Sequence, residues 1–164
     1  MKHLYLIRHA KSSWDHPHLE DMKRPLSNRG KQDAPFMGNR LREMGVQPDL
    51  IISSPAKRAY KTARKIAKQV SFPRKKIIIN DQIYLNGSQA LFNLVKGLDE
   101  QFKTVFLVGH NPDITSLAYL LTHHRVDNIP TCGIFYVSFD VIFWHDITEG
   151  SGAFQFFDYP KKHI

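Results

Sequence analysis

Cysteine and long apolar runs are both scarce in this sequence. The only cysteine among its 164 residues is Cys132, which excludes an internal disulfide and a cysteine-rich zinc site. No apolar run approaches the roughly 20 residues of a transmembrane helix. The apolar run before Arg8 is too short for a signal peptide. We therefore expect residues 1–164 to form one domain of a cytoplasmic protein that has no membrane partner.

Acidic residues are fewer than basic residues. The sequence has 15 Asp and Glu and 23 Lys and Arg, which gives a formal net charge of +8. A basic chain suits either nucleic acid or a phosphorylated substrate. The basic residues are dispersed, without the interleaved aromatics of single-strand-binding proteins, so we expect no nucleic-acid partner. One helical segment has a basic side that we interpret as a solvated face. Its residues are Lys57, Lys61, Arg64, Lys65 and Lys68.

The apolar run Leu4–Ile7 predicts a short buried strand that ends abruptly on Arg8 and His9. Open α/β sheets bind their ligands just beyond the carboxyl ends of strands. The neighbouring arginine disfavours protonation of His9, so we expect a neutral, nucleophilic imidazole at physiological pH. With Lys11 close behind, this position suggests a site for an anion. The alternative is a strand that ends in two solvated polar residues.

The rest of the chain alternates between strand-like apolar runs and segments with helical periodicity. The expected strands cover residues 4–7, 50–52, 77–79, 104–108, 134–141 and 153–157. The expected helices begin near Ser27, Ser54, Ser88 and Pro112. A helix after each of the first four strands predicts an α/β fold, in which helices cover both faces of a mostly parallel sheet. The last strands predict a late antiparallel addition to it.

Prolines, a glycine and a serine mark the expected helix boundaries. The first helix is expected to have Ser27 as its N-cap and to end near Gly45. Pro35 lies inside this span, so either the helix kinks there or a short turn precedes a helix that starts near Pro35. Pro55 and Pro112 each fit the first position of a later helix.

The stretch from Trp14 to Pro25 has no period and is expected to be a loop beyond the first strand, where function often lies. It contains His16 and His18, but their spacing suits no helical pair of metal ligands. We therefore expect no structural metal there, and we expect this loop to cover the site at the strand end.

Four residues are expected at strand ends or in the first turn of a helix: Arg8, His9, Arg58 and His110. Arginine guanidinium groups match phosphate oxygens bidentately, and an imidazole can attack phosphorus. Arg58 opposes the helix dipole at its position, an arrangement that a bound anion would make tolerable. The combination, more than any single member, predicts a phosphoryl-binding site.

The motifs around these residues carry a resemblance. In chain order they are Leu6-Ile7-Arg8-His9-Ala10-Lys11-Ser12, Arg24-Pro25-Leu26-Ser27 with Arg29-Gly30, Ser53-Ser54-Pro55-Ala56 with Arg58-Ala59 and Thr62-Ala63, and Val108-Gly109-His110-Asn111-Pro112. Together they resemble the histidine phosphatase superfamily and, within it, the SixA-like phosphohistidine phosphatase branch. The segment Ile129–Gly133 and the strand after it also resemble that branch.

This resemblance implies a phosphoglycerate mutase-like, three-layer α/β/α sandwich without metal or organic cofactor. It implies that His9 becomes transiently phosphorylated, and that Arg8, Arg58 and His110 bind the phosphoryl group. Lys11 and Ser12 are further candidates for phosphate binding, although they could instead only shape the turn.

One position departs from the family. Phosphoglycerate mutase-like members carry a carboxylate general acid where this chain has Tyr84. Asp81 is the candidate substitute, and Asp15, Glu20 and Asp21 in the loop are others. An alkoxide leaving group needs a proton donor, whose help is typically worth ~10²–10⁴-fold. The imidazole of phosphohistidine can already carry a proton near neutrality and needs little such help.

We therefore expect a hydrolase that removes phosphate from phosphohistidine in a phosphoprotein. Two alternatives remain open on the sequence. One is a small-molecule phosphomonoesterase of the same superfamily, which needs a general acid that the sequence does not assign to any one carboxylate. The other is a phosphate-binding module that has kept the arginines but lost turnover.

Overall fold

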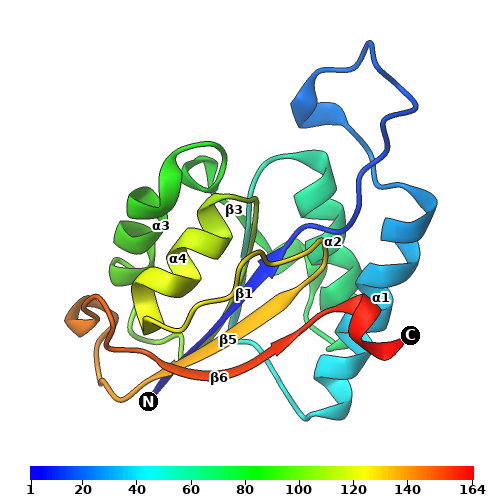
Figure 1. The fold of residues 1–164 in the computed structure, drawn as a ribbon. Helices are drawn as coiled ribbons and strands as arrows, with labels where there is room; N and C mark the ends of the chain where they lie inside the picture. The colour runs from blue at the N-terminus through cyan, green and yellow to red at the C-terminus, as the bar shows by residue number, and fades with distance from the viewer.

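A computed structural model describes residues 1–164. Its single sheet has six strands in the order β3-β2-β4-β1-β5-β6 (Figure 1). They are β1 (Lys2–Arg8), β2 (Leu50–Ser53), β3 (Ile78–Ile79), β4 (Thr104–Gly109), β5 (Ile134–Phe139) and β6 (Ala153–Asp158). The first four strands run parallel, whereas β5 pairs antiparallel with β1 and with β6. The predicted parallel sheet and its late antiparallel addition are both confirmed.

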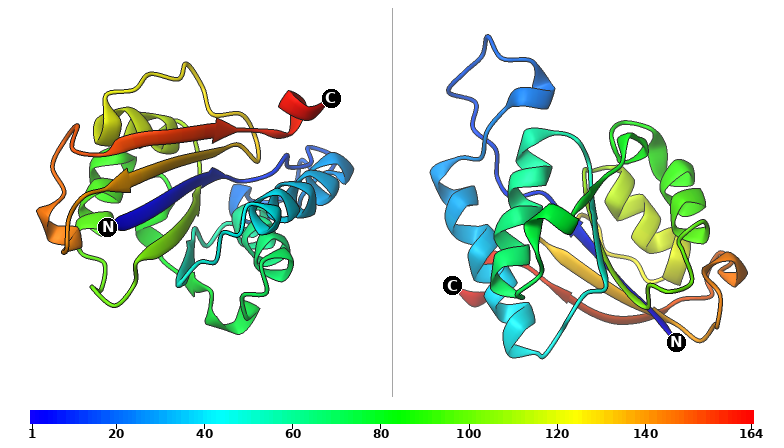
Figure 2. Two further views of the ribbon diagram at one scale, coloured as in Figure 1. Left: turned by 90° about the horizontal axis from the view of Figure 1, so that it is seen from below. Right: turned by 180° about the vertical axis from the view of Figure 1, so that it is seen from behind.

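Helices cover both faces of the sheet (Figure 2). They are α1 (Asn28–Glu43), α2 (Lys57–Gln69), α3 (Gly87–Lys96) and α4 (Asp113–Thr122). Alternate residues of β1 point to opposite faces, so Leu4 and Leu6 join the apolar core under α3 and α4. Tyr5 and Ile7 join the core under α1 and α2. This three-layer α/β/α arrangement is the phosphoglycerate mutase-like fold that we expected. No helix is long and apolar enough to cross a membrane.

The boundaries of the first helix follow the local signals. The Ser27 hydroxyl accepts a hydrogen bond from the Gly30 amide at 3.1 Å, and Gly45 lies just past the helix with a φ of 75°. The helix continues through Pro35, so a start near that proline is wrong. Ala34, Met37 and Leu41 are fully buried around Pro35 and pack this segment onto the sheet.

Three other helix starts differ from expectation. Helix α2 begins at Lys57, because the Ser54 hydroxyl instead accepts from the Ala56 amide in a turn ahead of it. Helix α3 begins at Gly87, whose amide donates to the Asp113 carboxylate at 3.0 Å, so a tertiary contact replaces the predicted cap. Pro112 is the N-cap of α4 and does not occupy its first position.

Candidate active site

The pairing of β1 with β4 brings His9 and His110 together. Arg8 stands opposite Gly109 in the parallel register, and the His9 amide donates to the Gly109 carbonyl at 3.0 Å. Each histidine is therefore the first residue beyond its strand, and the two rings lie 5.1 Å apart. A cavity of about 220 Å³ opens at this edge. It is lined by Arg8, His9, Lys11, Ser12, Trp14, Arg24, Arg58 and Thr131.

His9 is held by one ring nitrogen and is free at the other. Its Nδ1 lies 2.7 Å from the Ala10 carbonyl, which can only accept, so Nδ1 carries the proton. Nε2 has no protein partner and keeps its lone pair. The Ala10 amide donates to the Thr62 hydroxyl at 2.9 Å. This hydrogen bond holds Ala10 in place, and the Ala10 carbonyl in turn orients the His9 ring.

The pKa of His9 is lowered to about 3. Burial of the ring is the largest cause, since only 8% of the residue is exposed, and the charges of His110, Arg58 and Arg8 add to it. The expected neutral imidazole is thus confirmed, but its main cause is desolvation and not the adjacent arginine. At physiological pH His9 is therefore neutral, and it lines the cavity with the lone pair of Nε2 unprotonated.

His110 is 4% exposed and does not line the cavity, although it lies beside His9. Its Nε2 is 2.7 Å from the Ser54 hydroxyl. Because that hydroxyl already accepts from the Ala56 amide, it is best placed to donate its own proton to Nε2. Nδ1 then carries the ring proton, and this buried atom has no partner in the protein. Burial, followed by the charge of Arg58, lowers the pKa of His110 to about 4.

Arg8 and Arg58 both place a positive charge at the cavity, although they belong to different elements of the fold. Arg8 ends β1, and one Nη donates to the Ile129 carbonyl at 3.1 Å. Its Nε is buried without a partner, so it is a second unmatched donor near the histidines. Arg58, in the first turn of α2, is 6% exposed. It donates to the Asp21 carbonyl at 2.7 Å and to the Asp21 carboxylate at 2.9 Å.

Asp21 joins the loop to the site. It opens a short 3-10 helix, η1 (Asp21–Lys23), and its carboxylate also accepts from the Tyr84 hydroxyl. Partial burial acts to raise its pKa, but hydrogen bonds from Tyr84 and Arg58 prevail and lower the pKa to about 2. Tyr84 in turn lies 5.4 Å from the His110 ring. Asp21 is therefore ionised at neutral pH and cannot serve there as a proton donor.

Arg24 organises the other side of the cavity. One Nη donates to the Ser12 hydroxyl, and its guanidinium lies 3.3 Å from the ring centroid of Trp14, which is 75% exposed. The Ser12 hydroxyl is thus engaged by Arg24. Lys11 lines the cavity with an exposed side chain, while its carbonyl accepts from Ser27.

The other candidate acids lie outside this arrangement. Asp81 begins the 3-10 helix η3 (Asp81–Ile83), is exposed, does not line the cavity, and its carboxylate makes no hydrogen bond. Asp15 and Glu20 are exposed loop residues that also do not line the cavity. No group of three or more His, Cys, Asp or Glu side chains is placed to hold a metal ion.

The sequence reasoning missed several residues that support the site. Ser54, Thr62 and Arg24 all lie within the motifs named above, and their polar side chains, which bond the His110 ring, the Ala10 amide and the Ser12 hydroxyl, were the only local signal for these roles. The contact of Asp21 with Tyr84 had no such signal. It joins residues 63 positions apart, and nothing local in either segment predicts it.

Comparison with known proteins identifies relatives of this sequence. Residues 4–83 match the model of the histidine phosphatase superfamily (branch 1). An uncharacterized chloroplastic protein of Arabidopsis thaliana is 32% identical over 139 residues, which cover 80% of this chain and 63% of that protein. The mitochondrial serine/threonine-protein phosphatase Pgam5 of Drosophila melanogaster is 33% identical over 81 residues, 47% of this chain and 26% of that protein. The chain thus spans less than two thirds of either relative.

Solved structures share the whole fold. A SixA structure from Agrobacterium tumefaciens has a TM-score of 0.81 and 23% identity, with coverage of 97% of this chain and 98% of that chain. The protein histidine phosphatase SixA complexed with tungstate has a TM-score of 0.80 and 21% identity, with 99% of both chains covered. A phosphoserine phosphatase from Entamoeba histolytica, in complex with phosphoserine, has a TM-score of 0.66 and 21% identity, with 96% of both chains covered.

Proposed function

We propose that this chain, whose residues 4–83 match the histidine phosphatase superfamily, is a phosphatase that forms a phosphohistidine intermediate on His9. The substrate that the site suits best is phosphohistidine carried by another protein. The observation that carries this proposal is the state of His9, a buried, neutral imidazole whose Nδ1 is anchored and whose Nε2 faces a cationic cavity. The protein histidine phosphatase SixA, which shares this fold, was solved in complex with tungstate, a tetrahedral oxyanion like phosphate, and this supports phosphoryl binding by a protein of this fold.

In the first step, His9 Nε2 attacks phosphorus in line with the leaving nitrogen. The new Nε2–P bond forms as the substrate N–P bond breaks, and the bonding electron pair leaves on the substrate imidazole. A proton already on the other nitrogen of that ring makes the leaving group neutral. Arg8 and Arg58 stabilise the charge on the phosphoryl oxygens, and His110 Nδ1–H supplies a further donor.

In the second step, water attacks the phosphorus of phospho-His9. An O–P bond forms, the Nε2–P bond breaks, and its electron pair restores the lone pair of Nε2. The water proton passes to phosphate or solvent. Throughout both steps Nδ1 keeps its proton on the Ala10 carbonyl, so the ring does not have to change tautomer.

The lack of a proton donor favours phosphohistidine over ordinary esters. The position that aligns with the family acid is occupied by Tyr84, whose pKa is raised chiefly by its hydrogen bond to Asp21. Asp21 itself has a pKa of about 2. Neither group protonates an alkoxide readily at neutral pH, whereas a protonated imidazole leaves without help.

Rapid quenching tests the proposal. Wild type and His9→Ala are mixed with a peptide whose phosphohistidine carries a labelled phosphoryl group. We expect wild-type label that survives base, is lost in acid and turns over to free phosphate, with none on His9→Ala. Label from phosphoserine or sugar phosphates, but not from the peptide, would point instead to a small-molecule phosphomonoesterase. Binding of phosphate without label or release from any substrate would indicate a binding module.

A further inference from the structure

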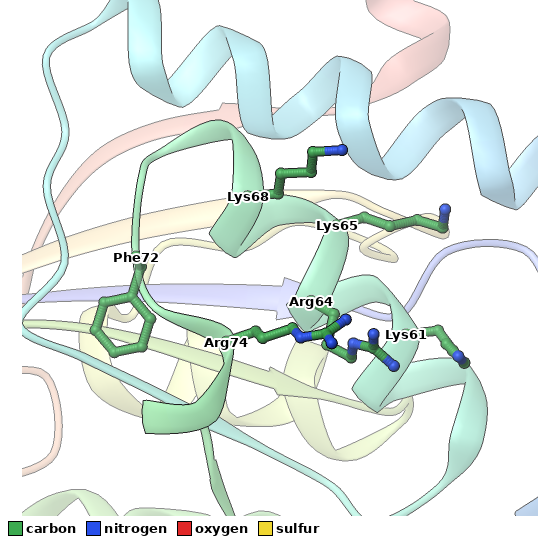
Figure 3. A pocket seen from close by; sticks show the side chains of 6 residues that line it. All are labelled: Lys61, Arg64, Lys65, Lys68, Phe72 and Arg74. Atoms are coloured by element: carbon green, nitrogen blue, oxygen red, sulfur yellow. The ribbon is translucent and has the colours of Figure 1, made fainter.

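Two adjoining hollows along α2 are lined mostly by cations. One, of about 420 Å³, is lined by Lys61, Arg64, Lys65, Lys68, Phe72 and Arg74 (Figure 3). The other, of about 280 Å³, is lined by Pro25, Leu26, Lys31, Lys57, Lys61 and Lys65. They share Lys61 and Lys65, so they form one surface. We call its seven cations the basic face: Lys31, Lys57, Lys61, Arg64, Lys65, Lys68 and Arg74.

The basic face has no acidic partners. Helix α2 contains no Asp or Glu, and none of the seven cations forms an ion pair. By contrast, Arg24, Arg40 and Arg58 are each paired with an aspartate. The crowding lowers the pKa of Lys61, first through the charge of Arg64 and then through slight burial and the charges of other cations. An external anion would relieve this repulsion.

The basic face leads to the catalytic cavity. Helix α2 turns Arg58 inward to the cavity from its first turn, while its outer side carries Lys57 to Lys68 over about 16 Å, at 1.5 Å per residue. Pro25 and Leu26 line the nearer hollow, and the adjacent Arg24 lines the His9 cavity. A chain lying on the basic face would therefore end beside the site.

In place of the purely solvated face that the sequence suggested for this side of α2, we propose that the basic face docks an acidic segment of the phosphoprotein substrate, so that its phosphorylated side chain enters the His9 cavity. This rests on the function proposed above. Nucleic acid fits less well, because Phe72 is the only aromatic residue in either hollow and is 8% exposed, so bases have no platform on which to stack. Long-range attraction between such surfaces raises association rates by about 10- to 1,000-fold at low salt.

Two synthetic peptides test the proposal. Both carry one phosphohistidine, followed in one by a run of glutamates and in the other by glutamines. We expect wild type to cleave the acidic peptide with a kcat/KM at least ~10-fold higher at low salt, mainly through KM. Added salt should shrink this preference, because charges more than about 8 Å apart are screened at physiological ionic strength.

Matched charge reversals locate the effect. Lys61→Glu/Lys65→Glu should abolish the preference while kcat/KM for the glutamine peptide stays unchanged. Lys103→Glu/Arg125→Glu makes the same change in net charge at exposed residues outside the basic face and should keep the preference. Lys61→Gln/Lys65→Gln, which preserves helix propensity, should give an intermediate value. Equal cleavage of both peptides by wild type, or a preference that survives Lys61→Glu/Lys65→Glu, would overturn the docking proposal.

A binding measurement separates this proposal from the proposed function. If wild type cleaves neither peptide, the proposed function fails, but fluorescence anisotropy of the labelled, unphosphorylated acidic peptide still reports on the basic face. Binding that is lost only in Lys61→Glu/Lys65→Glu supports an acidic protein partner. No binding, or tighter binding of a labelled oligonucleotide that the same variant loses, overturns it, and the second result favours nucleic acid.

Discussion

His9 and His110 occupy matching places, yet each leaves a different ring nitrogen without a partner in the protein. Both follow a buried parallel strand, both are buried, and both have a lowered pKa. His9 donates its Nδ1 proton to a carbonyl and leaves the Nε2 lone pair free. His110 binds the Ser54 hydroxyl through Nε2 and leaves Nδ1 without a partner. Equivalent sequence positions thus leave a free lone pair on one ring and a free N–H donor on the other, and the anchoring partner decides which.

Alanine substitution of each histidine should separate the two roles most strongly. Under the proposed mechanism, His9→Ala removes the nitrogen that attacks phosphorus, so turnover should fall by at least ~10⁴-fold with no phospho-enzyme. His110→Ala removes one donor to the phosphoryl oxygens, so the rate should fall by ~10²–10³-fold while labelled His9 still forms. Single-turnover quenching measures both rates. Equal losses, with no label in either variant, would mean that the two residues are not functionally distinct.

Thr62→Val tests the anchor of His9. Valine keeps the shape of threonine but leaves the Ala10 amide without an acceptor, which costs ~1–3 kcal/mol in a buried place. We expect lower stability towards urea and a roughly 10-fold lower kcat, because the Ala10 carbonyl no longer holds the ring.

Thr122→Val is the matched control for Thr62→Val. The Thr62 hydroxyl donates to the Arg58 carbonyl four residues earlier in the chain, and in α4 the Thr122 hydroxyl donates in the same way to the Ala118 carbonyl. The Thr122→Val variant should therefore change stability without changing kcat. A Thr62→Val variant with full kcat would show that the Ala10 carbonyl does not need Thr62 to orient His9.

Ser54→Ala tests the anchor of His110 and should have a smaller effect. Without the hydroxyl, the Nδ1–H tautomer of His110 is no longer favoured, so we expect kcat to fall by about 3- to 10-fold, with phospho-His9 still formed. Ser53→Ala, whose buried hydroxyl donates to the Ser54 carbonyl, is the neighbouring control. An equal loss in Ser53→Ala would assign the effect to packing.

The lowered pKa values predict a stability that falls with acid. In the unfolded chain a histidine titrates near 6.5, but in the folded protein His9 titrates at about 3 and His110 at about 4. Between these values the unfolded state binds more protons, so the free energy of unfolding falls as pH falls, by roughly 1.4 kcal/mol per unit for each histidine. Above pH 6.5 this contribution is complete.

Urea unfolding of wild type and of His9→Gln/His110→Gln at pH 7 and pH 5 measures this contribution. The variant should lose less stability between the two pH values than wild type does. A decline with acid that is the same in both proteins would contradict the predicted burial of two neutral rings.

The sequence predicted where the strands end, but it did not predict the tertiary hydrogen bonds that position the side chains around them. Apolar runs located β1 and β4, and parallel pairing then required His9 and His110 to meet at one edge. The starts of α2 and α3 were misplaced because the Ser54 hydroxyl binds in a turn and Asp113 caps Gly87 from another helix. The link from Asp21 to Arg58 and Tyr84 is equally tertiary, so local pattern could not predict it.

The proposed roles of His9 and His110 are tested most directly by identifying the nitrogen that carries the phosphoryl group. Protein with ¹⁵N-labelled histidine is phosphorylated by the peptide, denatured rapidly in base and examined by NMR for coupling between nitrogen and phosphorus. We expect one adduct, on Nε2 of His9. Phosphate on Nδ1 of His9, or on His110, would contradict the assignment of the free lone pair and with it the division of roles between the two histidines.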